Sequence, residues 1–370
     1  MELLRSIATS FWTRVVVSLG LLAFVASRID VGAGASRLSH GRWGWFVAAV
    51  GVLFLSFLVA ARRWFLFLEA AGVGGTLSNA VRAYLIGAFT SNFLPTQFGG
   101  DVTRAWIAGR PGTRIRAAAT VVVDRATALG CLIVVAWVVL ALDPGPVPGS
   151  LVLALSGATA ALCVAGFVVA GFFRSGTPPR RLFARFDEPI RDVRAAVRAC
   201  LRGRVFWRTA VLGLLFQALV ALALWLVARS IALHASFSVL AVTLPVVLLL
   251  AAAPVSIGGL GVREGSFVLL LGQAKVGATE ATLLSLMSGA TLAIASLPGG
   301  VAILVPRVRR PAGRSAAAQS DDREQERREE HLDPGDRGSR GENREPRLGQ
   351  RAEAAADPRA EDRSAGDQPG

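Results

Sequence analysis

The sequence has few of the residues that build covalent cross-links and catalytic centres. It contains three cysteines and three histidines among its 370 residues. Cys131 and Cys163 lie in apolar stretches and Cys200 lies in a polar segment, so we expect packing cysteines, with no disulfide framework and no metal cluster. No histidine stands beside a carboxylate in an apolar stretch, so the sequence does not favour acid–base catalysis and predicts no cofactor.

Charge is also scarce over long stretches of the first 306 residues. Hydrophobic residues make up 53% of the chain, and its mean hydropathy is +0.50. A soluble domain of this length could not bury so much apolar surface. We therefore expect an all-α polytopic membrane protein with about six to eight transmembrane helices. The main apolar stretches are Val15 to Ala26, Trp43 to Ala61, Ala117 to Leu142, Leu151 to Phe173, Val211 to Ala228, Phe237 to Ala253 and Ala281 to Val305.

Residues 307–370 differ from this membrane region in composition. They contain 14 arginines and 15 acidic residues, separated by Pro, Gly, Ser and Ala, and such a segment cannot bury a core. The sequence thus predicts a membrane domain at 1–306 and a disordered, charged cytoplasmic tail at 307–370. The first 306 residues carry a net charge of +15, which lies in loops, so no nucleic-acid partner is indicated.

Arginines in short loops mark the cytoplasmic side of a membrane protein. The segment 174–208 is rich in arginine and 143–150 has none, so we expect the first inside and the second outside. Three arginines at 307–310 follow the last apolar stretch, and Arg5 and Arg14 precede the first apolar stretch. The first apolar stretch lacks a convincing cleavage site, so we expect it to be a retained anchor. We therefore predict a multi-pass protein of a bacterial inner (plasma) membrane with both termini in the cytoplasm.

Apolar residues recur at helical spacing within the basic segment 174–208. Ile190, Val193, Val197 and Leu201 alternate with the arginines. This pattern predicts an amphipathic helix lying in the headgroup layer. The alternative is a solvated linker helix.

A break interrupts the apolar stretch at 81–106. Arginines on both sides of this stretch, at 62–63 and 110–116, indicate the cytoplasm, and a single crossing cannot return to its own side. We therefore expect a re-entrant hairpin with hinges at Pro95, Gly99 and Gly100, because proline removes a helix hydrogen bond and glycine allows unusual backbone angles. Such backbone at membrane depth must be buried in protein or line a wet cavity.

A second break repeats the motif of the first. Residues 95–104 read PTQFGGDVTR and residues 254–263 read PVSIGGLGVR, with hinges at Pro254, Gly258 and Gly259 in the second. From the loop charges, the second hairpin should open to the opposite face, as in inverted-topology repeats that bind substrate near the midplane. Two alternatives stay open: glycines that only let helices pack closely, and two complete crossings on either side of the second break.

Seven charged residues lie in or at the edge of the apolar stretches, where an unpaired charge is costly. Asp101 and Arg104 are three apart on one helix and can pair, and Asp124 can neutralise an arginine across the bundle. Because Arg263 should point to another helix face, we expect Glu264 to pair with a different arginine or to act as a proton-coupled carboxylate. The predicted set comprises the lipid headgroup-binding residues Arg82, Arg104, Arg125 and Arg263 and their charge partners Asp101, Asp124 and Glu264.

This set suits an anion. Arginines outnumber carboxylates, and guanidinium groups bind phosphate oxygens in two-point contacts. Free amide groups where the second helix of each hairpin begins would add to such a site. The alternative, strongest for Arg82, is that some of these arginines only mark the cytoplasmic interface.

Three motifs in this order resemble one known family. SNFLPTQFGGDVTRAW (91–106), VDRATALG (123–130) and APVSIGGLGVREGSFV (253–268) look like signatures of the lysylphosphatidylglycerol synthase transmembrane, or flippase-like, family. The resemblance spans roughly residues 11–305. In proteins of the multiple peptide resistance factor type, such a region is joined to a soluble synthase domain and is implicated in moving aminoacylated phosphatidylglycerol between leaflets.

The resemblance implies the lipid-handling half of such a protein, without the aminoacyl-transfer domain. We therefore predict a lipid flippase or transporter whose partner is a membrane lipid with an anionic headgroup, either an aminoacylated phosphatidylglycerol or a lipid-linked sugar. The alternatives are an intramembrane lipid-modifying enzyme with Asp124 or Glu264 as base, and a membrane scaffold for a separate glycosyltransferase or lipid synthase.

Overall fold

The computed structural model describes residues 39, 41–92, 99–145, 147–174, 187–252 and 261–305. Within these ranges the chain forms ten α-helices and no strand, which confirms the predicted all-α fold. Several predicted features lie outside the described residues. They are the apolar stretch at 15–26, Pro95, the second-break residues Pro254, Gly258 and Gly259, and the segment from 307 onward.

Five helices are long and apolar enough to cross a membrane. They are α3 (Trp43–Ala70), α6 (Arg114–Leu142), α7 (Gly149–Arg174), α9 (Gly203–Ser230) and α12 (Ala278–Leu304). At 26 to 29 residues each, they extend about 40 Å, more than the roughly 30 Å of a hydrocarbon core. They coincide with five of the predicted apolar stretches, and the chain is a multi-pass membrane protein.

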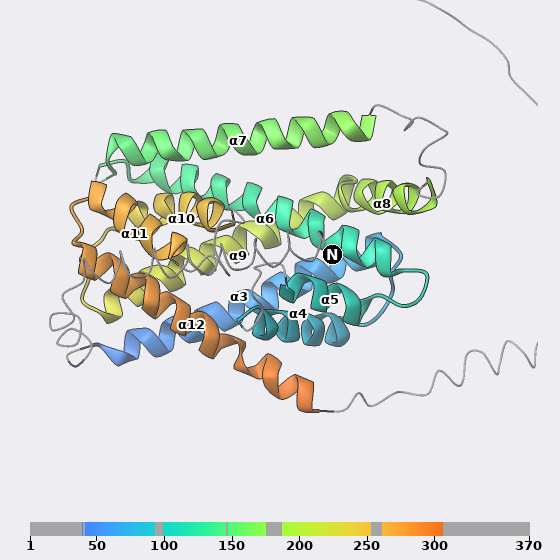
Figure 1. Ribbon diagram of the computed structural model, residues 1–370, viewed down its shortest axis with the longest axis horizontal. Coiled ribbons are helices and arrows are strands. Elements are labelled where there is room, and N and C mark those ends of the chain that lie inside the picture. The colour runs from blue at the N-terminus through green and yellow to red at the C-terminus, as the bar shows by residue number, and fades with distance from the viewer. Residues whose placement is uncertain are drawn as a thin grey trace, which may run out of the picture. The chain divides into compact units, whose positions relative to one another are not determined.

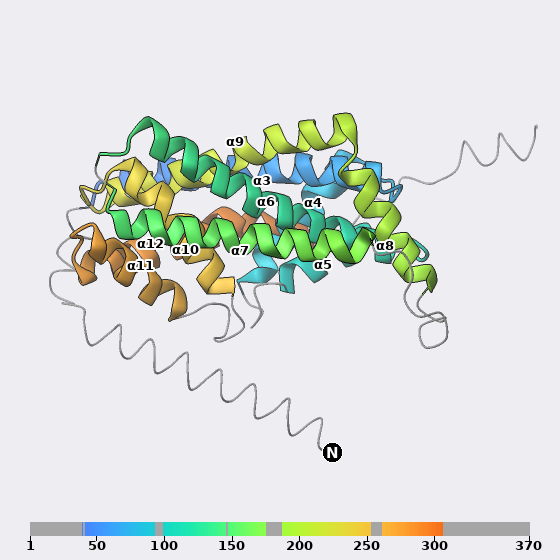
Figure 2. The same ribbon diagram turned by 90° about the horizontal axis from the view of Figure 1, so that it is seen from above.

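Four shorter helices form two hairpins. The first consists of α4 (Leu77–Ser91) and α5 (Gly99–Ala108), and the second of α10 (Phe237–Ala252) and α11 (Val262–Gln273). With 10 to 16 residues each, these helices extend only about 15 to 24 Å and are too short to span a bilayer alone. Figures 1 and 2 show the α4–α5 hairpin at one end of the bundle and the α10–α11 hairpin at the other.

The two hairpins enter the bundle from opposite ends, as the paired breaks predicted, and their short helices fit re-entrant segments. Below, the ends of the bundle are called the α4–α5 end and the α10–α11 end. At the second break the described helices, of 16 and 12 residues, are shorter than the roughly 20 residues of a complete crossing.

The chain repeats one order of helices: long, short, short, long. Helices α3 to α6 contain 28, 15, 10 and 29 residues, and helices α9 to α12 contain 28, 16, 12 and 27. The first unit starts at the α10–α11 end and the second at the α4–α5 end (Figure 1). Two units of the same order and opposite direction are an inverted repeat.

The connections after α3 and α9 share their local structure. Each connection has six residues, 71–76 and 231–236. The Val73 N–H donates to the Leu68 carbonyl at 3.0 Å, and the Leu233 N–H donates to the Ala228 carbonyl at 2.9 Å. These bonds, which reach back five residues, are typical of the Schellman motif that closes a helix.

The helices that follow begin in the same way in both units. The Thr76 hydroxyl accepts a hydrogen bond from the Asn79 N–H at 3.3 Å. The Ser236 hydroxyl accepts one from the Val239 N–H at 3.2 Å. Both are N-caps, which satisfy an amide left free in the first helical turn. The repeat therefore extends to individual backbone bonds.

Helix α8 (Asp187–Cys200) packs against the bundle. Ala196 and Cys200 are buried in a cluster with residues of α3 and α6, and Val193 and Val197 pack against the same cluster. The predicted amphipathic helix is confirmed, but its apolar face lies on protein, and Leu201, predicted to belong to that face, follows the helix and is exposed. Cys200, expected in a polar segment, is the fully buried last residue of α8.

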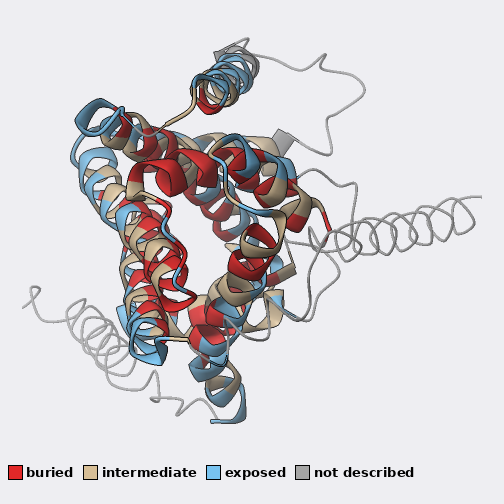
Figure 3. Ribbon diagram, turned by 90° about the vertical axis from the view of Figure 1, so that its left-hand side faces the viewer, coloured by how far each residue is buried: buried red, intermediate tan, exposed pale blue. Residues whose placement is uncertain are grey.

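Helix α12 contacts both hairpins through small residues. A Cβ atom added at Gly299 would collide with the Leu85 carbonyl in α4, and one added at Gly289 would lie 2.8 Å from Arg263 Nη2 in α11. Figure 3 views the bundle from the α10–α11 end and shows that buried residues lie mostly on the inward faces of the helices. Glycine at these positions lets α12 approach α4 and α11 closely.

Candidate functional site

A chain of alternating charges joins α3, α5 and α6. Asp124 of α6 accepts a hydrogen bond from Arg63 Nη2 of α3 at 2.5 Å and one from Arg104 Nη2 of α5 at 2.9 Å. All three side chains are more than nine-tenths buried. The prediction that Asp124 neutralises an arginine across the bundle is confirmed, and it neutralises two.

The chain of charges continues to Arg125 through Asp101, which lies in the first turn of α5. Arg104 Nε donates to Asp101 Oδ1 at 3.1 Å, which confirms the predicted pair. Arg125 donates to both oxygens of Asp101, from Nε at 2.7 Å and from Nη2 at 3.0 Å. This two-point contact fixes the plane of the Arg125 guanidinium.

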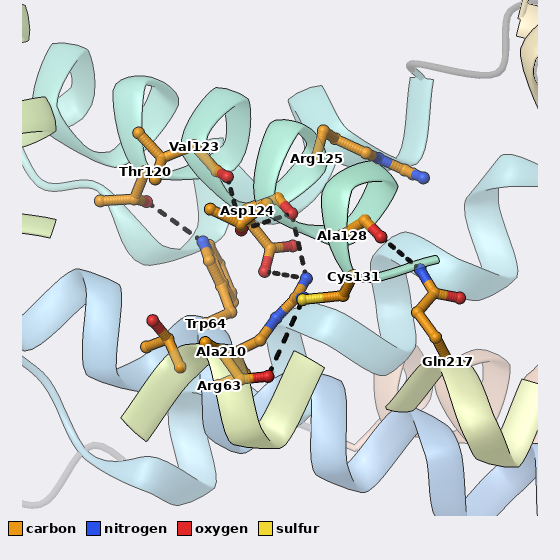
Figure 4. Close-up of polar contacts among 12 residues, drawn as sticks. Arg63, Trp64, Thr120, Val123, Asp124, Arg125, Ala128, Cys131, Ala210 and Gln217 are labelled. Atoms are coloured by element: carbon orange, nitrogen blue, oxygen red, sulfur yellow. Dashed lines mark hydrogen bonds and ion pairs between the residues drawn. The ribbon is translucent and has the colours of Figure 1, made fainter. Parts of the chain in front are cut away.

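Arg63 is the member of this cluster that the sequence did not indicate. Its guanidinium lies 5.6 Å from the centre of the Phe216 ring in α9. A Cβ atom at Gly213 of α9 would lie 3.0 Å from Arg63 Nη1, so the glycine makes room for the arginine. Figure 4 shows Arg63 pointing from α3 toward Asp124 and Cys131.

The exposure of the side chains differs sharply within the cluster. Those of Arg63, Asp124, Arg104 and Asp101 are 1 to 9% exposed, whereas that of Arg125 is 55% exposed. In Figure 4, Arg125 points away from Asp124 and Arg63. Of the predicted headgroup ligands in this region, Arg125 is therefore accessible in this conformation and Arg104 is not.

Arg104 is held by aromatic rings as well as by carboxylates. Its guanidinium lies 4.9 Å from the Trp64 ring and 5.0 Å from the Tyr84 ring. The Arg104 Nη1 atom and the Arg63 Nε and Nη1 atoms are buried without a hydrogen-bond partner. Contact with π-faces compensates in part for missing hydrogen bonds, and the cluster retains donors that no acceptor among the described residues meets.

A second charged cluster lies where α11 begins. Arg263 Nη2 donates to Glu264 Oε1 at 2.8 Å, and Ser285 of α12 donates to the same oxygen at 3.2 Å. Glu264 Oε2 accepts from the Gly261 N–H at 2.7 Å. We expected Glu264 to pair with an arginine of another helix or to couple to protons. That expectation is wrong about its partner, because Glu264 caps its own helix and the Arg263 side chain folds back to it.

Both hairpins place a carboxylate at the same position. Asp101 is the third residue of α5, and Glu264 is the third residue of α11. A negative charge in the first turn of a helix is stabilised by the helix dipole. In each hairpin, the carboxylate of the second helix therefore occupies the predicted anion site. Arg125 binds the Asp101 carboxylate of α5, and Arg263 binds the Glu264 carboxylate of α11.

The two clusters lie at similar depths from opposite ends. Asp124 is ten residues from the start of α6, and Arg263 is ten residues from the end of α11. At the helical rise, each residue is about 15 Å from its own end of the bundle. Because the long helices extend about 40 Å, each cluster lies a little short of the middle of the bundle.

Arg82 has a different role from the other predicted arginines. Its Nη2 atom donates to the carbonyls of Ala302, at 2.8 Å, and Val305. These are carbonyls at the end of α12, where a positive charge is stabilised by the helix dipole. Arg82 therefore joins α4 to the end of α12 and does not belong to either charged cluster.

The remaining predicted residues fall into two groups. Gly99 and Gly100 are the first two residues of α5, and a Cβ atom at Gly100 would collide with Gly87 of α4. The hinges Pro95, Pro254, Gly258 and Gly259 lie outside the described residues. Across the described ranges, no group of three or more His, Cys, Asp or Glu residues could hold a metal ion.

One comparison with known proteins identifies a family for this chain. A family model described as "Lysylphosphatidylglycerol synthase TM region" matches residues 11–299. The matched region includes both hairpins and both charged clusters, and it confirms the resemblance of the three motifs. No curated protein and no solved structure matched the chain.

Proposed function

Because the chain belongs to the lysylphosphatidylglycerol synthase transmembrane-region family, we propose that it moves an anionic, phosphate-bearing lipid between the two leaflets of a bilayer. The family ties this multi-pass membrane protein to lipid metabolism or transport. An aminoacylated phosphatidylglycerol or a lipid-linked sugar fits the proposed class of lipid. We further propose a bacterial inner membrane, with the α4–α5 end and both termini in the cytoplasm.

The observation that carries the proposal is the unequal charge of the cluster from Arg63 to Arg125. Among the described residues three arginines face two aspartates, which leaves one positive charge at membrane depth. Such a charge requires a partner or a ligand. A phosphate group meets this need, because it binds guanidinium through two parallel hydrogen bonds.

The contacts suggest a separate task for each residue. Arg125 would meet the phosphate, since its side chain is 55% exposed. Asp101 would orient Arg125, and the buried pair of Arg104 with Asp124 would hold Asp101 in place through Arg104. In this conformation the inner part of the cluster is closed, so passage of a headgroup requires the α4–α5 hairpin to move.

The inverted repeat supports transport between leaflets. A headgroup near the midplane would lie between two hairpins that open to opposite ends, and rocking of one unit against the other would expose it alternately. Arg263 is 26% exposed and would receive the phosphate at the α10–α11 end.

The two alternative functions receive less support from these contacts. Each candidate base, Asp124 and Glu264, already accepts hydrogen bonds from arginine, and these contacts occupy oxygens that a general base would need free. These bonds favour a positioning role over general base catalysis. A scaffold for a separate glycosyltransferase or lipid synthase would not need an uncompensated charge at membrane depth, although such an enzyme could accompany the transporter.

Leaflet exchange in proteoliposomes tests the proposal. The full-length protein should exchange a fluorescent anionic phospholipid faster than protein-free liposomes. Arg125→Gln should slow this exchange roughly tenfold or more, because one charge-assisted contact is lost. Exchange no faster than in protein-free liposomes would contradict the proposal.

Arg116→Gln provides the matched control. Arg116 lies on the same helix and is 39% exposed, and it also pairs with an aspartate, Asp192, at 3.0 Å. It lies in the first turn of α6, outside the charged cluster. Its replacement should leave exchange within about twofold of the wild-type rate, since exposed ion pairs contribute little. If Arg116→Gln and Arg125→Gln slowed lipid exchange equally, the proposed role of Arg125 in binding the phosphate would be contradicted.

A further inference from the structure

A line of exposed residues runs along α6 from its first residue to the charged cluster. It consists of Arg114, Ala118, Val122 and Arg125. Arg125 follows Arg114 by eleven residues, which is close to three helical turns, so the two arginines lie on one side of the helix about 16 Å apart. The line thus connects the α4–α5 end with the accessible side of the cluster.

Helix α5 borders this line at both ends. The Arg114 guanidinium lies 3.8 Å from the centre of the Trp106 ring, and the Arg125 guanidinium is bonded to Asp101. Between these contacts α5 exposes Val102. The exposed faces of α5 and α6 therefore lie beside one another and form a single surface.

This surface combines acyl-chain and phosphate chemistry. Val102 and Val122 are 66% and 68% exposed, and such apolar side chains are compatible with lipid chains. Arg125 stands beside them with a half-exposed guanidinium. Hydrocarbon alone is a poor environment for that charge, whereas a phospholipid offers a phosphate for the arginine and chains for the valines.

We propose that the surface formed by Val102, Trp106, Arg114, Ala118, Val122 and Arg125 is a docking site for an anionic phospholipid arriving sideways from the bilayer. The phosphate first contacts Arg114 at the membrane surface and then Arg125 at depth, and the acyl chains stay in the bilayer against Val102 and Val122. This inference rests on the proposed function and adds the route by which the lipid arrives. Free phosphate shares the headgroup chemistry but gains nothing from the valines, so the occupant is a lipid.

Photocrosslinking of lipids to the full-length protein tests the site. A photoreactive residue replaces Val122 in vesicles of equal parts phosphatidylglycerol and phosphatidylethanolamine, and mass spectrometry measures the ratio of the two crosslinked lipids. Phosphatidylglycerol should be enriched roughly fivefold, the effect of one arginine at a membrane surface. The same residue at Val138, which is exposed on the other half of α6, should capture both lipids equally.

Three results bear on the inference. Equal capture at positions 122 and 138 would overturn it, and so would loss of enrichment in an excess of inorganic phosphate. Support requires that the double variant Arg114→Gln and Arg125→Gln brings the ratio of crosslinked phosphatidylglycerol to phosphatidylethanolamine at position 122 to one. Unchanged capture at position 138 would show that this variant is folded.

The same vesicles separate this inference from the proposed transport. Enrichment at position 122 without leaflet exchange would confirm the docking site and contradict transport. Exchange without enrichment would overturn the docking site alone.

Discussion

Gly72 and Ala232 hold the same left-handed backbone conformation, with φ of 68° and 53°. Each is the second residue after a long helix, α3 for Gly72 and α9 for Ala232. The two connections lie at opposite ends of the bundle (Figure 1). Alanine is strained at positive φ and glycine is not. The two inverted units thus share the same backbone conformation after their first long helix. In the second unit this conformation is held by Ala232, although alanine disfavours positive φ.

Relief of this strain gives the first prediction. Ala232→Gly should stabilise the protein by up to about 1 kcal/mol, less the entropy that glycine adds to the unfolded chain. Ala228→Gly makes the same chemical change in the buried last turn of α9 and should destabilise it by about 1 kcal/mol. Thermal unfolding in detergent measures both variants. Equal losses for the two would show that Ala232 is unstrained.

The buried pair of Arg63 with Asp124 gives the second prediction. Arg63→Met should destabilise the fold by about 3 to 5 kcal/mol, because it leaves part of a buried carboxylate without its partner. Arg62→Met is the control, since Arg62 is the adjacent residue of α3 and its side chain is exposed. The melting temperatures of the two variants in detergent check this. A loss for Arg62→Met as large as that for Arg63→Met would refute the structural role of the pair.

Arg63 also shows where sequence reasoning ended. The rule that loop arginines mark the cytoplasmic side predicts a loop at Arg62 and Arg63, and therefore an earlier end to the helix than the structure shows. Helix α3 continues to Ala70 through the apolar residues that follow Arg63, and this continuation was the available signal. A charge inside an apolar helix of 28 residues indicates a buried partner.

Close packing of α12 on α4 gives the third prediction. Gly299→Ala places a methyl group against the backbone of Leu85 and should destabilise the protein by about 1 to 3 kcal/mol. Gly130→Ala in α6 has open space around the new Cβ and should stabilise its helix by up to about 1 kcal/mol. Thermal unfolding of both variants decides the matter, and a stabilising Gly299→Ala would contradict the observed contact.

The Cys200 thiol gives the fourth prediction. Burial raises its pKa to about 12, so the reactive thiolate is scarce in the folded protein at neutral pH. Maleimide labelling of Cys200 should therefore stay low from about pH 7 to pH 9, a range over which an ordinary thiol ionises. Leu201→Cys places a thiol at the adjacent, exposed position and should label readily, with labelling that rises over that range.

Peptide mapping by mass spectrometry distinguishes the two thiols. Denaturation should make Cys200 as reactive as the thiol at position 201. Ready labelling of Cys200 in the folded protein would mean that α8 separates from α3 and α6 in solution.

The sequence predicted the hairpins because their causes are local. Proline and paired glycines interrupt the apolar stretches. The arginines at 110–116 were a sound charge marker on one side of the first break, whereas Arg62 and Arg63 on the other side lie inside α3. The pair of Asp101 with Arg104 was also predictable, because residues three apart share a helix face. Each of these inferences needs only neighbouring residues or a count of charges.

The partner of Glu264 was not predictable in this way. Gly261 has φ of 80°, and the resulting turn brings its amide to the Glu264 carboxylate. The long Arg263 side chain then reaches the same carboxylate although the two residues are adjacent. Helix periodicity predicts the direction of each Cβ atom, but it does not predict the position of the guanidinium group at the end of a long, flexible arginine side chain.

The selectivity of lipid exchange tests the central claim most directly. In liposomes containing the full-length protein, exchange is measured separately for a fluorescent anionic phospholipid and for a zwitterionic one with the same chains. If the positive charge at Arg125 receives a phosphate-bearing headgroup, the anionic lipid should exchange faster, and Arg125→Gln should bring the ratio of the two rates toward one. Equal rates for both lipids in the wild-type protein, or a ratio unchanged by Arg125→Gln, would contradict the account.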